Sequence, residues 1–197
     1  AFEMFTRPII QQIAAKTGYL VEEAPQTVYP DFTLLRKKDD QEKIAIDIKS
    51  TYRKPSIQFT LGSYTSFLRN GTKNILYPYD QYSRHWIIGF VYSRIPNPSD
   101  KLVTLESRGT IAPPYGEVEW FVQDKFRISG ESPGSGNTAN IGSMKTDDIT
   151  DFGLGLGPFA KLGEKVFREY WANYDGKAYR NLESYFRWKE GRSSTRR

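Results

Sequence analysis

The sequence contains no cysteine and a single histidine, His85, among its 197 residues. The lack of cysteine excludes disulfides, thiolate nucleophiles, zinc fingers and iron–sulfur clusters. One histidine excludes multi-histidine zinc sites and catalysis by a histidine pair, and no nucleophile-elbow motif indicates a serine triad. Because His85 directly precedes the apolar run 86–92, we expect it to be structural. Any catalysis is therefore expected to use carboxylates, lysine and a hard metal ion.

Long apolar runs are also missing. The longest, residues 86–92, is far shorter than the roughly 20 residues that span a membrane. We therefore expect no membrane segment, and no signal peptide is visible. The composition, 38% hydrophobic and 26% charged, is that of a globular protein, and the length predicts a single domain over residues 1–197. Because the chain begins with Ala1, part of the natural N-terminus is expected to be missing.

Positive charge is concentrated at the C-terminal end. Residues 177–197 hold seven Lys and Arg and two Glu, and the resulting +5 equals the formal net charge of the whole chain. A basic end on a neutral body is typical of contact with a polyanion such as nucleic acid. A solubilising tail would have the same composition, so both interpretations stay open.

The spacing of apolar residues predicts an α+β protein with a mixed sheet. Residues 2–17 repeat apolar side chains every three or four positions, which indicates a helix despite Pro8. Apolar runs indicate strands at residues 19–23, 32–37, 43–49, 85–94 (buried on both faces) and 117–124. Further helices are predicted at residues 61–70, 158–174 and 181–190, and a loop at 95–116.

The strands at 32–37 and 43–49 form a predicted hairpin that carries two acids and a lysine. Isoleucines at 44, 46 and 48 alternate with Ala45, Asp47 and Lys49. Strand side chains alternate between faces, so Asp47 and Lys49 point to the same side. Antiparallel pairing about residues 39–40 places Asp31 opposite Asp47 or Lys49.

Two carboxylates that face each other across strands repel, so a fold gains from the arrangement when positive charge lies between them. Lys49 supplies part of that charge, and Mg²⁺ would supply more, since oxygen ligands without Cys or His favour Mg²⁺ over zinc. Mg²⁺ can polarise a phosphate and activate water, while a lysine stabilises negative charge. The pattern predicts phosphodiester hydrolysis. An ordinary ion pair between solvated strand charges is the alternative.

Pro30-Asp31 followed by Asp47-Ile48-Lys49 is similar to the PD-(D/E)xK motif of a nuclease superfamily. Beyond that motif, nearly the whole chain resembles the EcoRV family of type II restriction endonucleases. The matching stretches are FTRPII (5–10), IAIDIK (44–49), YTSF (64–67), HWIIG (85–89), QDK (123–125), GSGNT (134–138) and NIGS (140–143).

The resemblance implies a restriction-endonuclease-like core, in which helices flank a central mixed β-sheet. It implies a bacterial, cytoplasmic homodimer that cuts both strands of double-stranded DNA with Mg²⁺, for which Mn²⁺ can substitute. Asp31, Asp47 and Lys49 match the catalytic residues, and Glu3 matches a further catalytic acid. The metal-binding set is Asp31, Asp47, Glu3 and Ile48. A cognate DNA methyltransferase is the expected functional partner.

Residues 134–143 are rich in Gly, Ser and Asn but do not match a P-loop. Glycine lets a backbone approach a base edge, asparagine can bond adenine, and a threonine methyl can pack on thymine. From composition alone, a flexible surface loop is the alternative. The resemblance implies that this loop reads a GATATC-like palindrome, which the enzyme cuts bluntly. The base-reading residues that it implies are Gly134, Ser135, Gly136, Asn137, Thr138 and Asn140.

Other DNA contacts follow from the same resemblance. Gln26 matches a minor-groove contact, although the segment 24–28 is one residue shorter than the family pattern. Thr51, Ser66 and Lys73 fall where phosphate contacts are expected. Two rival functions remain: a repair or junction nuclease with the same core, which the base-reading loop disfavours, and a non-catalytic DNA-binding module, which would bind without metal and never cut.

Overall fold

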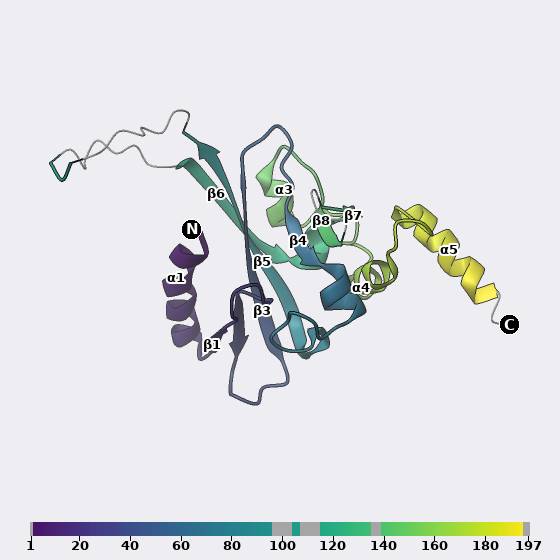
Figure 1. Cartoon of the computed structure of the whole chain (residues 1–197), viewed down its shortest axis with the longest axis horizontal. Helices are drawn as coiled ribbons and strands as arrows, with labels where there is room; N and C mark the ends of the chain where they lie inside the picture. Colours follow the sequence, from purple (N-terminus) through teal and green to yellow (C-terminus); the bar gives the residue numbers. More distant parts are fainter. Residues whose placement is uncertain (1, 96–103, 107–114, 135–138, 195–197) are drawn as a thin grey trace.

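The computed structural model describes residues 2–95, 104–106, 115–134 and 139–194. Its centre is a five-stranded sheet in the order β1-β2-β3-β5-β6 (Figure 1). The strands β3 and β5 run parallel, and all other neighbours are antiparallel. Their bounds are β1 Leu20–Glu23, β2 Phe32–Leu35, β3 Lys43–Tyr52, β5 Tyr82–Arg94 and β6 Tyr115–Asp124. The predicted α+β class with a central mixed sheet is confirmed.

Helix α1 (Phe2–Thr17), which its apolar spacing predicts, covers one side of this sheet, although Phe5, Ile9 and Ile13 of the predicted apolar set are exposed. Its buried residues Ile10 and Ala14 pack with Phe32, Leu34 and Ile46 of β2 and β3 in one apolar cluster. The isoleucine face of the predicted hairpin therefore lies against α1. The side chains at 45, 47 and 49 consequently point to the opposite side of the sheet.

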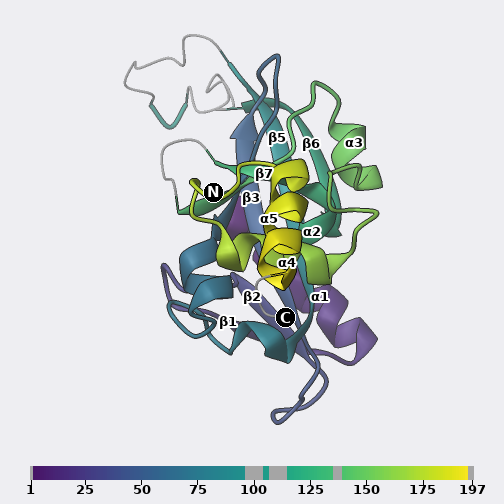
Figure 2. The same ribbon diagram turned by 90° about the vertical axis from the view of Figure 1, so that its right-hand side faces the viewer.

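A smaller three-stranded sheet and the remaining helices lie on that opposite side (Figures 1 and 2). The small sheet has the order β4-β8-β7. Its core is rich in aromatic residues, among them Phe59, Phe121, Tyr170 and Trp171. The elements are β4 Thr60–Ser63, β7 Ser129–Pro133, β8 Asn140–Ser143, α2 Lys125–Ile128, α3 Ile149–Leu154, α4 Glu164–Asn173 and α5 Leu182–Ser194.

Three predicted elements differ from the observed ones. Residues 61–70 were expected to be a helix, but strand β4 pairs with β8, and only Thr65–Arg69 form a π-helical turn, η1. Within residues 134–143, whose composition predicts a surface loop, Asn140–Ser143 instead form strand β8, which pairs with β7. The expected helix 158–174 begins at Glu164, after Gly163 takes the left-handed φ of 86°. In the first two cases, pairing between distant segments overrides the local pattern.

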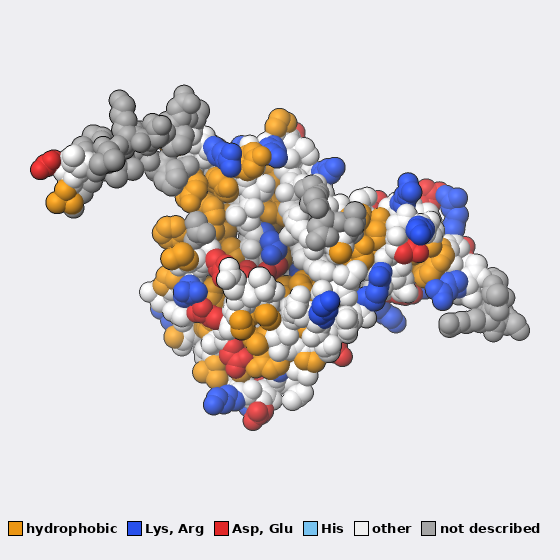
Figure 3. Space-filling model, viewed as in Figure 1, with side chains coloured by type: hydrophobic (Ala, Val, Ile, Leu, Met, Phe, Trp, Pro, Cys, Tyr) orange, Lys and Arg blue, Asp and Glu red, His pale blue; other side chains and the backbone are white. Residues whose placement is uncertain are grey.

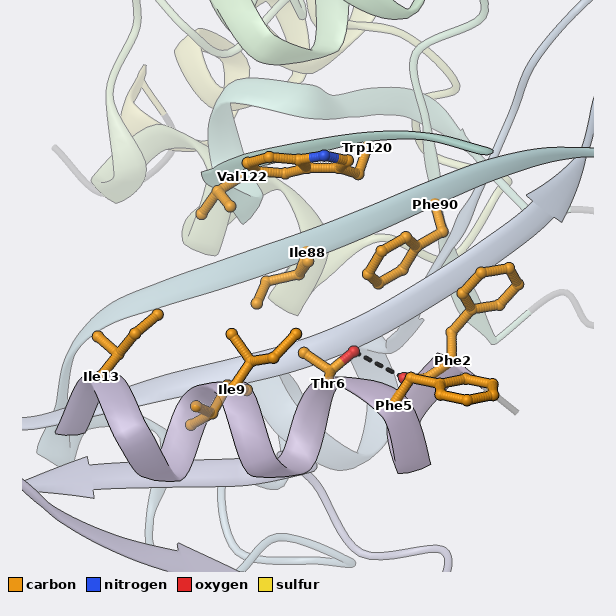
Figure 4. A pocket seen from close by; sticks show the side chains of 10 residues that line it. Phe2, Phe5, Thr6, Ile9, Ile13, Ile88, Phe90, Trp120 and Val122 are labelled. Carbon is orange, nitrogen blue, oxygen red and sulfur yellow. Dashed lines mark hydrogen bonds between the residues drawn. The ribbon is translucent and has the colours of Figure 1, made fainter. Parts of the chain in front are cut away.

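The prediction that β5 is buried on both faces is confirmed for one face only. On the α1 side, Ile88 and Phe90 line an open apolar groove of about 410 Å³ between α1 and β6 (Figure 4). Exposed apolar side chains of both elements line it, among them Phe5, Ile9 and Ile13 of α1 and Trp120 and Val122 of β6. Hydrophobic side chains gather on the side of the molecule where α1 lies (Figure 3). Within the described residues, no helix is long and apolar enough to cross a membrane.

Candidate active site

The β2–β3 register brings the two predicted acids together. Phe32 pairs with Ile46 and Leu34 with Ile44, so Asp31, immediately before β2, lies beside Asp47 on the neighbouring strand. The Asp31 Oδ2 atom accepts a hydrogen bond of 2.5 Å from the backbone N–H of Ile48. This contact fixes the first acid against the strand that carries the second, as the hairpin geometry predicted.

Asp47 and Lys49 project from β3 toward the same cavity. The Lys49 Nζ lies 2.8 Å from the Asp47 Oδ2, and the Asp47 side chain is almost fully buried. The cavity measures about 210 Å³, and Asp31 also lines it. The other lining residues are Thr27, Val28, Tyr29, Gly62 and Phe67. Two carboxylates and one ammonium therefore converge in a pocket large enough for a cation and a phosphate oxygen.

Burial and mutual repulsion perturb the charges in this pocket. Burial, followed by the nearby Asp47 carboxylate, raises the pKa of Asp31 to about 7, against the lowering effect of the Ile48 N–H and Lys49. For Lys49, burial alone would lower the pKa, but Asp47 and Asp31 outweigh it and raise that pKa above its ordinary value. Lys49 is therefore protonated at neutral pH, and its single positive charge does not balance the two neighbouring carboxylates.

These residues fit a hard divalent cation. Asp31 and Asp47 offer oxygen atoms from two strands, and Ile48 could contribute only its backbone carbonyl. Glu3, exposed on α1, is near enough for its charge to raise the pKa of both Asp31 and Lys49. No group of three acids or histidines in the described part of the chain is gathered as a ready metal cage. An open set of few carboxylates suits Mg²⁺, which keeps waters and takes substrate phosphate oxygens as further ligands.

An aromatic cluster that sequence reasoning missed supports the site from behind. Tyr29 stacks on Phe67 of η1, with 4.5 Å between ring centroids, and His85 stacks on Tyr79 at 3.7 Å. The Tyr29 hydroxyl and His85 Nδ1 share a hydrogen bond of 2.7 Å. Burial, together with the Lys125 ammonium, lowers the pKa of His85 well below its ordinary value. His85 is therefore neutral and packed, as predicted.

The predicted phosphate-contact residues lie on segments that border the pocket. Thr51 follows Asp47 and Lys49 on the same face of β3, and Ser66 belongs to η1, next to Phe67. Lys73 is exposed on a loop whose residues 74–76 bond to the backbone of Tyr29. Gln26 is exposed in the turn before Tyr29.

Two of the predicted base-reading residues lie next to each other at the ends of β7 and β8. Gly134 is buried, its N–H donates to the Asn140 carbonyl, and a Cβ at this position would lie 3.0 Å from the Thr60 hydroxyl. Asn140 is partly exposed at the start of β8. The remaining residues of this prediction, Ser135, Gly136, Asn137 and Thr138, lie outside the described residues.

Comparisons with known proteins agree with this geometry. The family model of restriction endonuclease EcoRV matches residues 1–190. The type II restriction enzyme EcoRV of Escherichia coli is 48% identical over 199 residues, which cover 95% of this chain and 80% of that enzyme. A match over almost the whole chain, including the strands that carry both acids and the lysine, shows the family. The chain therefore belongs to the EcoRV family of restriction endonucleases.

Proposed function

We propose that this site-specific DNA endonuclease uses Mg²⁺ held by Asp31 and Asp47, with Lys49 as its catalytic lysine. The observation that carries the proposal is the convergence of Asp31, Asp47 and Lys49 in one cavity. When bound, Mg²⁺ would polarise the scissile phosphate and lower the pKa of a water molecule. Mn²⁺, which also prefers oxygen ligands, would substitute for it. Glu3 and the Ile48 carbonyl complete the proposed metal-binding set.

The side chains of the pocket have separate roles in this proposal. Because its pKa is raised, Lys49 stays protonated at neutral pH and donates hydrogen bonds to the attacking water or the phosphate. Asp47 holds the Lys49 ammonium in place at 2.8 Å. The hydrogen bond from Ile48 orients one oxygen of Asp31 and leaves the other for the cation. Glu3, whose charge acts on both Asp31 and Lys49, adds negative potential that favours a cation in the cavity.

The DNA substrate is proposed to be a GATATC-like palindrome that is cut bluntly at its centre. Base reading is assigned to the segment between β7 and β8, with Gly134, Ser135, Gly136, Asn137, Thr138 and Asn140 in the major groove. Gln26 faces the minor groove, and Thr51, Ser66 and Lys73 contact phosphates. The basic helix α5 adds attraction to the backbone that is independent of sequence. The family match supports this recognition sequence, since the GSGNT stretch of this chain (134–138) lies within the matched residues 1–190.

A palindrome has two-fold symmetry, and an enzyme that cuts both strands matches it as a homodimer. We place the dimer contact on the apolar groove between α1 and β6, because exposed apolar patches of this kind mark interaction sites (Figure 4). Trp120→Lys, at a side chain 66% exposed, is expected to produce monomers in sedimentation equilibrium. Leu154→Lys, at a side chain 62% exposed on α3, is the control and should leave the dimer intact.

Cleavage of a plasmid with one GATATC site, in Mg²⁺ or in EDTA, tests the proposal. We expect one blunt-ended linear product in Mg²⁺ alone. Asp47→Ala and Lys49→Ala should abolish cleavage but retain DNA binding, whereas Asp39→Ala, in the exposed β2–β3 turn, should cut normally. Cutting at other sequences would refute the assigned site, and cutting by Asp47→Ala at the wild-type rate would refute the catalytic assignment. Binding without cleavage by the wild type would favour a DNA-binding module.

Such an enzyme would work in the bacterial cytoplasm beside a DNA methyltransferase that protects the same sequence in the host. We treat residues 1–197 as one nuclease domain, because the small sheet and the central sheet share one apolar core that includes Phe59 and Phe121. Limited proteolysis that yields one stable core would support a single domain.

A further inference from the structure

Lys125 is a buried lysine directly behind the proposed metal site. It begins α2 immediately after β6 and is 1% exposed. Its Nζ atom is buried and has no hydrogen-bond acceptor among the described residues. A buried lysine without an acceptor costs a folded protein free energy, so its position calls for a compensating role.

The Lys125 amino group lies within an aromatic cage. Its Nζ is 3.9 Å from the ring centroid of Tyr29, 5.5 Å from that of Phe67 and 5.8 Å from that of Tyr79. Tyr29 and Phe67 line the catalytic cavity, and Tyr29 is two residues from Asp31. The rings stabilise the protonated amine through their electron-rich faces and separate it from solvent. The charge on Lys125 therefore acts on the carboxylates through a thin, apolar wall.

Most of the charged groups that act on Lys125 belong to the catalytic site. Burial, reinforced by Lys49, lowers the pKa of Lys125 to about 7, against the opposing carboxylates of Asp47, Asp31 and Glu164. The amine thus changes charge within the physiological pH range. Its charge state depends on whether the two metal-binding acids are free or neutralised.

Further charged or titratable groups face the cage from α4 and β5. From α4, Glu164 favours the protonated amine, and Arg168 lies 5.3 Å from the Tyr79 ring on the cage wall. From β5, His85 is neutral, since its own pKa is lowered by burial and by Lys125. Asp47 has the largest charge effect on Lys125, so it links the amine to the catalytic site.

We propose that Lys125 is a positioning residue of the metal site: its buried ammonium compensates Asp31 and Asp47 while no divalent cation is bound, and cation and ammonium then compete for these carboxylates. The inference rests on the proposed function, in which the two acids hold the metal. Cation binding releases the Lys125 proton to solvent, and by reciprocity a protonated Lys125 weakens cation binding.

The first test measures the Lys125 amine in the wild-type protein. Lysine is labelled with ¹³C at the carbon next to the amine, and its shift is followed against pH by NMR, with and without saturating Ca²⁺. We expect Ca²⁺ to lower the pKa of Lys125 by about one unit, which corresponds to about tenfold in affinity. Lys43 is the internal control: it is also buried, 4.5 Å from the Tyr77 ring, but contacts the Asp40 carbonyl and Gln81 instead.

A pair of variants separates charge from packing. Lys125→Arg keeps a charge at any pH, while Lys125→Met keeps the apolar stem and removes the charge. At about pH 8, we expect Lys125→Arg to bind Ca²⁺ about tenfold more weakly than Lys125→Met by calorimetry, the reciprocal of the expected pKa change. The matched pair Lys43→Arg and Lys43→Met should bind Ca²⁺ equally.

The outcomes distinguish this inference from the proposed function. If Ca²⁺ binding requires Asp47 but leaves the pKa of Lys125 unchanged, the coupling is refuted and the metal site stands. If Asp47→Ala binds Ca²⁺ as well as the wild type, the metal assignment fails and the inference fails with it. Should either variant not fold, the wild-type NMR titration alone decides, because it needs no substitution at Lys125.

Discussion

Replacing Asp31 by asparagine should stabilise the metal-free protein while it abolishes cleavage. Asparagine has nearly the same shape and keeps an oxygen that can accept the Ile48 N–H, which bonds Asp31 at 2.5 Å. The substitution removes a carboxylate that burial and Asp47 make costly to ionise. The gain in stability therefore measures the electrostatic cost of keeping two acids side by side.

The magnitude follows from the pKa of Asp31. A carboxyl with an ordinary pKa of 3.8 that is raised to about 7 in the folded protein costs roughly 4 kcal/mol when ionised, at 1.36 kcal/mol per pH unit. Solvent screening of this partly exposed group reduces the figure to about 2 kcal/mol. The cost is fully present above the folded pKa, decreases as the pH falls from about 7 toward 3.8, and vanishes below the unfolded pKa.

Urea denaturation in EDTA at about pH 8 and about pH 5 provides the assay. Asp31→Asn should be more stable than the wild type by about 2 kcal/mol at the higher pH, and by about a third of that at the lower pH. The control is Asp148→Asn, because the Thr150 N–H lowers the pKa of Asp148 at the start of α3 and its charge is favourable. Equal stability of Asp31→Asn and wild type at pH 8, or a difference independent of pH, would refute the reasoning.

Three further predictions concern the site and its support. At limiting Mg²⁺, initial cleavage rates should fall as the pH drops below about 7, because the Asp31 carboxyl, with its pKa of about 7, must lose its proton to bind the cation; a flat profile would contradict this. Tyr29→Phe removes the partner of His85 Nδ1 at 2.7 Å and should lower the free energy of unfolding by about 1–3 kcal/mol in urea. Gly89→Ala would place a Cβ 2.2 Å from a ring carbon of Phe121; the resulting overpacking should cost about 1–3 kcal/mol, seen as a lower Tm, and an unchanged Tm would show that the ring can move.

The sequence by itself determined the catalytic hairpin. The turn length and the alternation of isoleucines with Ala45, Asp47 and Lys49 leave two registers that bury the apolar face, with Asp31 opposite Asp47 or Lys49. The observed pairing is the one that brings Asp31 beside Asp47. Helix α1 could likewise be predicted, because its apolar spacing is a local property of the chain.

Only the tertiary structure decided how the rest of the site is built. Strand β4 pairs with β8 from a distant part of the sequence, so residues 60–63 are extended although their local pattern favours a helix. The cavity walls come from separate segments that carry Tyr29 and Phe67, and the cage around Lys125 adds Tyr79. Burial and pKa shifts depend on every group that surrounds a residue in space, and the sequence alone does not show which groups these are. For this reason the raised pKa of Asp31 and the place of Lys125 behind the acids follow from the fold, while the identity of the acids follows from the sequence.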